Sequence, residues 1–124
     1  LVLTEKLLTH GSQTAISNMK VELKGEGSSV QVISRSVAQD DSVQVFNPLV
    51  IGECACRGHV QCDAIIMGNA KVKAIPGIEA ASEDAMLVHE AAIGKIAGDQ
   101  IVKLMTLGLT EEEAEAEILD DFLS

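Results

Sequence analysis

Short apolar runs rich in Val and Ile dominate the chain up to about residue 95, and turn-forming residues separate them. The runs are VQVIS (30–34), SVQVF (42–46), HVQCDAIIMG (59–68), AKVKAI (70–75) and AMLVHEAAI (85–93). Runs of β-branched residues between clusters of Gly, Asp, Asn and Ser are typical of strands. Their regular recurrence predicts either a β-sandwich or a stacked solenoid.

Two details of these runs favour the solenoid. The segment AIIM (64–67) is apolar throughout, as in strands of a parallel sheet that is buried on both faces. The triplet VQV occurs twice, at 30–32 and 43–45, and only Gly68-Asn69 offers a hairpin signal. We therefore predict a mainly β fold, in which a parallel β-helix (a single-stranded solenoid) forms the core domain over residues 1–95.

From residue 96 to residue 124 the pattern becomes helical. Ile101, Leu104 and Met105 stand at the i, i+3 and i+4 spacing of one helix face. This spacing predicts a first helix over residues 99–107, which begins a separate C-terminal helical segment.

A second helix is predicted over residues 110–123. Thr110 and Glu113 have the spacing of a capping box, in which each side chain satisfies a backbone N–H of the other residue. Ile118 and Phe122 lie on one apolar line, and the opposite face is acidic. Helices this short must bury their apolar stripes, either against the body of the chain or against a partner.

The net charge of −10 is unevenly distributed. Residues 1–110 contain twelve acidic and nine basic residues, whereas residues 111–121 contain seven acidic residues and no basic one. The chain has no Trp or Tyr and only two Phe, so it lacks aromatic platforms for stacking bases. These properties argue against nucleic-acid binding. The seven acids are expected to form a solvated helix face or, alternatively, to dock on a basic groove of a partner.

The three cysteines, Cys54, Cys56 and Cys62, lie close together, with His59 among them. An odd, crowded set differs from a secreted disulfide framework, and no signal peptide or run of about 18 apolar residues is present. We therefore expect a reducing, cytoplasmic location and no membrane span. The chain begins with Leu1 rather than Met, which leaves open a segment ahead of it.

Three residues are the leading candidates for a binding site. A thiolate is a soft ligand for iron and for sulfur species, which favours Cys62. His89 and Glu90 also carry groups that bind iron, but neighbours on a strand point to opposite faces, so one site that uses both needs a bulge or an interface. In the simpler interpretation, Cys62 is a small, buried hydrophobic residue. His89 then caps the junction between strand and helix, and Glu90 is exposed to solvent.

A second candidate site combines all three cysteines with His59. Cys54, Cys56, His59 and Cys62 read C-x-C-x2-H-x2-C, a set of ligands suited to zinc or iron. The spacing is not a standard zinc signature, and the segment would have to fold back on itself. The alternative is a stack of small residues inside a solenoid. A thiol enzyme that pairs Cys62 with His89 is a further, weaker interpretation.

Three segments of the chain resemble the SufB/SufD family of iron–sulfur cluster assembly proteins. They are HVQCDAIIMGNAKVKAIPGIEA (59–80), LVHEAAIGKIAGDQIVKLMTLGLT (87–110) and TEEEAEAEILDDFL (110–123). They match the C-terminal half of the family and read closest to its short SufD-like members. The resemblance implies a right-handed parallel β-helix followed by short helices. It also implies a non-enzymatic scaffold role in cluster assembly. Because the open ends and strand edges of a β-helix must be capped or paired, we expect a dimer, with itself or with a SufB/SufD-type partner.

The same resemblance implies roles for individual residues. Cys62 and Glu90 match the cysteine and glutamate with which SufB builds the nascent cluster, and His89 matches a histidine that matters in SufD. Cys62, His89 and Glu90 are therefore expected to bind a transient iron–sulfur cluster, with no cofactor permanently bound. A purely structural subunit, which binds its partners but no iron, remains the alternative.

The resemblance also implies a partner, the ABC-type ATPase SufC. The chain has no Walker motif of its own, because the GEG at residues 25–27 is not followed by Lys and Ser or Thr. In the family the C-terminal helices dock on the ATPase, which corresponds here to residues 98–123. The expected partner-binding residues are Ile101, Leu104, Met105, Ile118 and Phe122.

Overall fold

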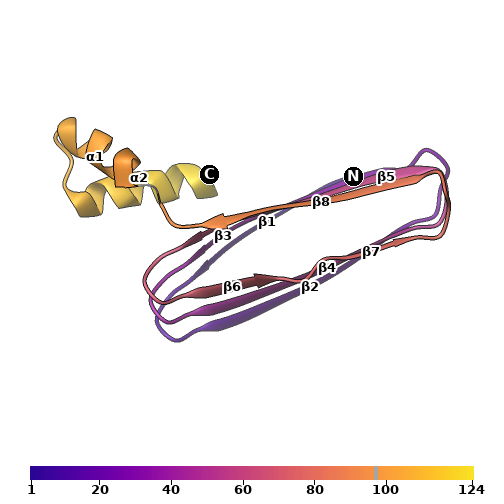
Figure 1. Ribbon diagram of the computed structural model, residues 1–124, viewed down its shortest axis with the longest axis horizontal. Helices are drawn as coiled ribbons and strands as arrows, with labels where there is room; N and C mark the ends of the chain where they lie inside the picture. The colour runs from indigo at the N-terminus through magenta and orange to yellow at the C-terminus, as the bar shows by residue number, and fades with distance from the viewer. Residues whose placement is uncertain (97) are drawn as a thin grey trace.

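The computed structural model of the chain describes residues 1–96 and 98–124, which form eight strands followed by two helices. The strands are β1 (Val2–Thr9), β2 (Thr14–Leu23), β3 (Ser29–Ala38), β4 (Val43–Gly52), β5 (Cys56–Ile66), β6 (Lys71–Ala74), β7 (Gly77–Ala80) and β8 (Ala85–Gly94). Sheet A contains β1, β3, β5 and β8, and sheet B contains β2, β4, β6 and β7. The two sheets are the long sides of a flattened solenoid (Figure 1).

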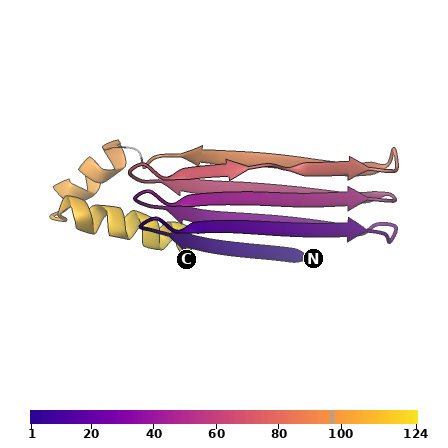
Figure 2. The same ribbon diagram turned by 90° about the horizontal axis from the view of Figure 1, so that it is seen from below.

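All strand pairs in both sheets are parallel. Val32 of β3 pairs with Val60 of β5 in sheet A, and Ile16 of β2 pairs with Val45 of β4 in sheet B. The chain alternates between the sheets, so that each turn adds one layer to the stack seen in Figure 2. The last strand, β8, lies at one end of sheet A and pairs with β5. The structure thus confirms the predicted parallel β-solenoid with two C-terminal helices.

Side chains along the strands alternate between the interior and the outer surface. In β4 every second residue is buried, as the period of two of a strand requires. The interior residues form one aliphatic core with a single aromatic member: Leu23, Val30, Val32, Phe46, Val50, Cys54, Cys56, Val60 and Cys62. Stacked layers of medium-sized side chains therefore fill the solenoid, as the near absence of aromatic residues requires.

The two VQV triplets have opposite orientations in this interior. Gln31 of β3 is exposed, whereas Gln44 of β4 is buried. The Nε2 group of Gln44 donates hydrogen bonds to Oγ1 of Thr9 at 2.9 Å and to the carbonyl of Val37 at 3.0 Å. A polar network therefore crosses one end of the core between the two sheets.

Gly68 lies at a corner of the solenoid. Its φ of +66° belongs to the left-handed region that glycine adopts without steric cost. The strand before it, β5, lies in sheet A, and the strand after it, β6, lies in sheet B. The hairpin signal at Gly68-Asn69 was therefore wrong, because the turn connects strands of different sheets.

The helices α1 (Gly98–Thr106) and α2 (Glu111–Leu123) lie beyond one end of the strands (Figure 1). Oγ1 of Thr110 accepts a hydrogen bond from the N–H of Glu113 at 3.1 Å, and the Glu113 carboxylate accepts one from the N–H of Thr110 at 3.2 Å. The predicted capping box is thus confirmed. In α2 the side chain of Ala114 is fully buried, and the helix contacts β3. Neither helix is long and apolar enough to cross a membrane.

Candidate functional site

Cys62 lies inside the solenoid, in a column of inward-facing residues of sheet A. In register, Glu5 pairs with Ser34, Ser34 pairs with Cys62, and Cys62 pairs with Ala91. Cys62 is 1% exposed. Burial raises the pKa of its thiol above the ordinary value, and the negative charges of Asp63 and Glu5 raise it further. The sulfur is therefore a neutral thiol in the free chain at pH 7.

His89 lies on the same inner face, one strand away from Cys62. It pairs with Val60, which makes it a diagonal neighbour of Cys62 across β5 and β8. Its Nε2 atom is buried and has no hydrogen-bond partner among residues 1–96 and 98–124. Burial lowers the pKa of His89, and the positive charge of His59 lowers it further. The imidazole is thus kept neutral, which is the form that binds metals.

Glu90 lies on the outer face of sheet A. Its Oε2 atom lies 3.4 Å from Nε2 of His59, another outward-facing residue. His89 and Glu90 therefore point to opposite sides of β8, as the strand period predicts. The structure brings Cys62 and His89 together and separates both from Glu90. A site that uses all three residues requires an interface at the edge of β8.

The β8 strand presents such an edge. It pairs with β5 on one side, and no strand of the described chain pairs with its other side. Ten residues of unpaired edge offer N–H and C=O groups to a strand of another chain. The edge lies next to His89 and one strand from Cys62, so a strand added there would lie close to both residues.

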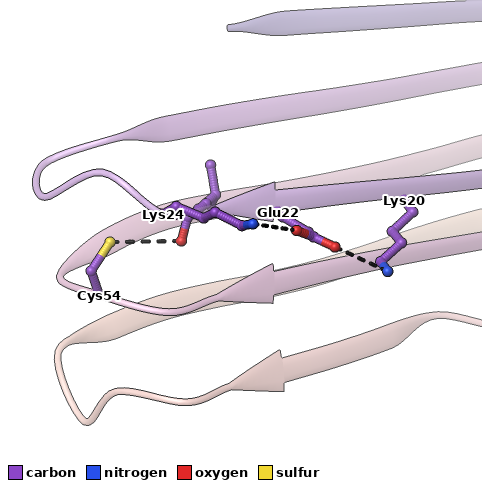
Figure 3. A network of polar contacts seen from close by, with 5 residues as sticks. Lys20, Glu22, Lys24 and Cys54 are labelled. Carbon is purple, nitrogen blue, oxygen red and sulfur yellow. Dashed lines mark hydrogen bonds and ion pairs between the residues drawn. The ribbon is translucent and has the colours of Figure 1, made fainter.

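Cys54 lies at a corner of the solenoid, just ahead of the start of β5. Its thiol donates a hydrogen bond to the carbonyl of Gly25 at 3.1 Å. Figure 3 shows Cys54 beside the surface that carries Lys20, Glu22 and Lys24. On the neighbouring surface, Lys20 and Lys24 form ion pairs with Glu22 at 3.0 and 3.2 Å. Such exposed pairs contribute little to stability. The role of Cys54 in this arrangement is to connect two loops.

The structure separates the four residues of the C-x-C-x2-H-x2-C pattern. Cys56 and Cys62 lie six positions apart on the extended strand β5, or about 20 Å. His59 faces outward, whereas all three cysteines are buried. In the described part of the chain, no three His, Cys, Asp or Glu side chains are grouped to hold a metal ion. The four-residue site does not form, and Cys54 and Cys56 belong to the core.

Glu5, which no sequence pattern had singled out as a candidate, turns its half-buried side chain to the inner face of β1. Its carboxylate accepts a hydrogen bond from Oγ of Ser17 at 2.7 Å. Glu5 and Cys62 both line a small cavity of about 10 Å³. The signal was present in the sequence, because Leu3, Glu5 and Leu7 alternate with polar residues and therefore share one face of a strand.

The helical segment leaves part of its apolar surface exposed. Met105 is 44% exposed, and the other predicted partner-binding residues are partly buried: Ile101, Leu104, Ile118 and Phe122. Two residues that the sequence analysis did not select, Val102 and Leu107, are 59% and 75% exposed. Val102, Met105 and Leu107 therefore form the uncovered apolar surface of α1 and the turn after it.

Comparison with known proteins places the sequence in a family. The sequence model of the family described as "SUF system FeS cluster assembly, SufBD core domain" matches residues 2–122. A protein named iron-sulfur cluster assembly SufBD family protein, from Methanothermobacter thermautotrophicus, is 34% identical over 118 residues, which cover 92% of this chain and 29% of that protein.

Two further relatives carry the same family name. One, from Pyrococcus horikoshii, is 40% identical over 94 residues, which cover 74% of this chain and 28% of the relative. The other, from Staphylococcus saprophyticus, is 30% identical over 115 residues, which cover 90% of this chain and 25% of the relative. The chain thus spans less than a third of the length of these relatives. By these sequence matches, the chain belongs to the SufBD family of SUF-system iron–sulfur cluster assembly proteins.

Proposed function

We propose that the chain forms part of a non-catalytic scaffold on which an iron–sulfur cluster is assembled as cargo. The observation that carries this proposal is the placement of Cys62 and His89 on one inner face, beside the open edge of β8. Thiolate and neutral imidazole are both iron ligands. The buried, unpartnered Nε2 of His89 in the described chain adds support, because a buried polar atom without a partner is costly unless a ligand satisfies it.

The scaffold works as a dimer, either of two identical chains or with a second SufB/SufD-type protein. The free edge of β8 supports pairing at that edge, since an exposed strand edge pairs readily with another strand. Such an interface also offers a role for Glu90. Its carboxylate faces away from Cys62 of its own chain and becomes a cluster ligand only in contact with the partner.

The second partner is a SufC-like ABC ATPase in the cytoplasm. The uncovered apolar surface of α1, with Val102 and Met105 one turn apart, supports docking of the helical segment. Nucleotide hydrolysis then belongs to the ATPase, and the scaffold itself catalyses no reaction.

A purely structural subunit is the second candidate function. It is favoured by the state of Cys62, which is buried and carries a raised pKa, so that no thiolate is available in the free chain. In this alternative the chain connects the ATPase to its partner, and the three cysteines only fill the core.

Anaerobic reconstitution with iron and sulfide, in the presence of the cognate ATPase, distinguishes the two functions. Iron, sulfide and visible absorbance are measured for the wild type, Cys62→Ala, His89→Ala and the control Cys54→Ala. The scaffold proposal expects a cluster in the wild type and in Cys54→Ala, and loss of the cluster in Cys62→Ala and His89→Ala.

Two results contradict the scaffold proposal. Absence of iron from every sample supports the structural subunit. A cluster that persists in Cys62→Ala would show that the thiol of Cys62 is not a ligand of the cluster.

A further inference from the structure

Two of the three cysteines lie at the same corner of the solenoid. Cys54 and Cys56 are 8% and 4% exposed, belong to one core cluster, and are separated by Ala55 alone. The chain bends at Cys54 and Ala55, between the end of β4 and the start of β5. Residues two positions apart are at most about 7 Å from Cα to Cα, and a bend shortens this distance into the range that a disulfide spans.

Contacts at this corner show that the two thiols are neighbours. A Cβ built on Gly52 would lie 2.9 Å from Sγ of Cys56, so the missing side chain of Gly52 leaves room for this sulfur. Burial raises the pKa of the Cys54 thiol, and the Cys56 thiol beside it raises the pKa further. Each sulfur is therefore within reach of the other, and both cysteines are free in this structure.

A buried hydroxyl beside Cys54 has no partner. Oγ of Ser28 is buried and makes no hydrogen bond within residues 1–96 and 98–124. Burial is the main influence on the pKa of Cys54 and raises it, whereas the nearby Ser28 hydroxyl lowers it. Hydrogen bonds to an ionised acceptor are stronger than those to a neutral one. The corner thus contains a donor whose acceptor forms when Cys54 loses its proton.

A cavity of about 280 Å³ gives reagents access to Cys56 at this corner. The cavity opens at the surface, because most of the residues that line it are exposed: Gly27, Ser29, Arg57, Asp84 and Met86. Cys54 is not part of the lining. The third thiol, Cys62, borders a cavity of only about 10 Å³. A small reagent therefore meets Cys56 before it meets either of the other two thiols.

We propose that Cys54 and Cys56 form a redox-active thiol pair, which small disulfides oxidise reversibly to a Cys54–Cys56 disulfide. The Cys56 thiolate attacks one sulfur of the small disulfide, whose S–S bond breaks and releases one small thiolate. Cys54, deprotonated beside the Ser28 hydroxyl, then attacks the Cys56 sulfur of the mixed disulfide and releases the second. The two cysteine protons pass to the released thiolates, so the pair loses two electrons and the small disulfide gains them.

Oxidation should loosen the loop of residues 24–28. Reduced Cys54 holds this loop through its hydrogen bond to the carbonyl of Gly25, beside the backbone bond from Gly27 to the carbonyl of Ala55 at 2.7 Å. The disulfide removes the S–H donor of the first bond. It closes a very short loop, so it adds little stability of its own and is readily reduced again. The corner thereby becomes a redox-sensitive contact between two turns of the solenoid.

Bis(2-hydroxyethyl) disulfide, added to the purified chain without iron, sulfide or ATPase, is the probe. After the remaining thiols are alkylated, trypsin releases residues 36–57, with Cys54 and Cys56, separately from residues 58–71, with Cys62. We expect the peptide 36–57 to lose two hydrogen atoms and to escape alkylation, and dithiothreitol to restore both thiols. The peptide 58–71 should remain alkylated at Cys62.

Single variants test the role of each residue. Cys54→Ser should stop at a mixed disulfide on Cys56. Cys56→Ser should react at least tenfold more slowly, because Cys54 does not border the cavity. Ser28→Ala should form the mixed disulfide like the wild type and close the internal disulfide more slowly. Cys62→Ala, the matched control, should oxidise like the wild type.

Hydrogen exchange at the backbone N–H of Gly27 measures the effect on the loop, and we expect at least tenfold faster exchange in the oxidised chain. Two free thiols in excess probe, or a wild type that stops at the mixed disulfide, overturns the thiol pair. Unchanged exchange at Gly27 after oxidation overturns the effect on the loop. Neither readout involves a cluster, so the scaffold proposal stands or fails separately.

Discussion

Glu90 pairs with His59 on the outer face of sheet A, with 3.4 Å between Oε2 and Nε2, while the neighbouring His89 faces the interior. This pair is partly exposed to solvent, and exposed pairs of this kind contribute less than about 1 kcal/mol. Adjacent residues of one strand therefore have separate environments, and their substitutions should have separate effects.

Replacement of Glu90 by Gln should change the free energy of unfolding by less than about 1 kcal/mol, because the contact with His59 that it alters is partly solvated. Denaturant titration measures this change, with His59→Gln as the matched variant. If Glu90→Gln nevertheless loses the cluster in the reconstitution experiment proposed above, the carboxylate acts in the chemistry. A destabilisation of several kcal/mol would instead show a structural role.

His89 should make the stability depend on pH. Its pKa is lowered in the folded chain by burial and by His59, so the unfolded chain takes up the proton at higher pH. Below the ordinary pKa of about 6.5 the unfolded state therefore binds more protons, and stability falls as the pH falls. We expect His89→Gln to lose less stability than the wild type between about pH 7 and pH 5. Parallel curves for the two proteins would contradict this assignment.

The two glutamines of the VQV triplets should respond differently to substitution. Gln44→Ala removes two buried hydrogen bonds and leaves the carbonyl of Val37 without its partner, which should cost about 1–3 kcal/mol. Gln31→Ala, at an exposed position of the same triplet sequence, should change stability by no more than about 0.5 kcal/mol. Urea denaturation of both variants tests the difference, and equal costs would show that the network is not stabilising.

Gly58 should not tolerate a side chain. An added Cβ would lie 2.8 Å from Cδ2 of Leu87 and 3.1 Å from Cγ1 of Val50, so Gly58→Ala should destabilise the chain by about 1–3 kcal/mol. A Cβ at Gly25 would meet no heavy atom within 4 Å, and Gly25→Ala serves as the control. Thermal unfolding of both variants gives the comparison. An unchanged unfolding temperature of Gly58→Ala would mean that the side chains of Leu87 and Val50 can shift to make room for the added methyl group.

The surface of α1 should bind the ATPase without contributing to the fold. Val102→Ser and Met105→Ser alter exposed side chains, so each should leave the unfolding midpoint almost unchanged. We expect the double variant to bind the cognate ATPase at least tenfold more weakly in a titration. Glu112→Gln, an exposed change on α2, is the control. Unchanged binding of the double variant would place the docking surface elsewhere.

Local patterns were sufficient to predict the solenoid, the helical segment and the capping box. The period of a strand also predicted that His89 and Glu90 point to opposite faces. These features depend on residues close together in the chain, such as Thr110 and Glu113. The apolar runs identified from residue 30 onward correspond to β3, β4, β5, β6 and β8, whereas β1, β2 and β7 were not identified individually.

The missed features depend on contacts between distant residues. Gln31 and Gln44 occupy identical triplets, and only the path of the chain through the corners decides which one faces inward. The pairing of Glu90 with His59 and the alignment of Glu5 with Cys62 depend on strand register, which the sequence does not display. Candidate residues were therefore predictable one at a time, and their combination into sites was not.

The position of β8 at the end of sheet A has a kinetic consequence for the buried thiol beneath it. A strand with a neighbour on one side separates from its sheet more readily than a strand held on both sides, and such local openings have their own free energy. Reagents from solution then reach Cys62 on this side mainly in the moments when β8 has detached from β5. The rate of thiol modification reports the frequency of strand opening, and a partner strand paired with β8 lengthens the intervals between openings.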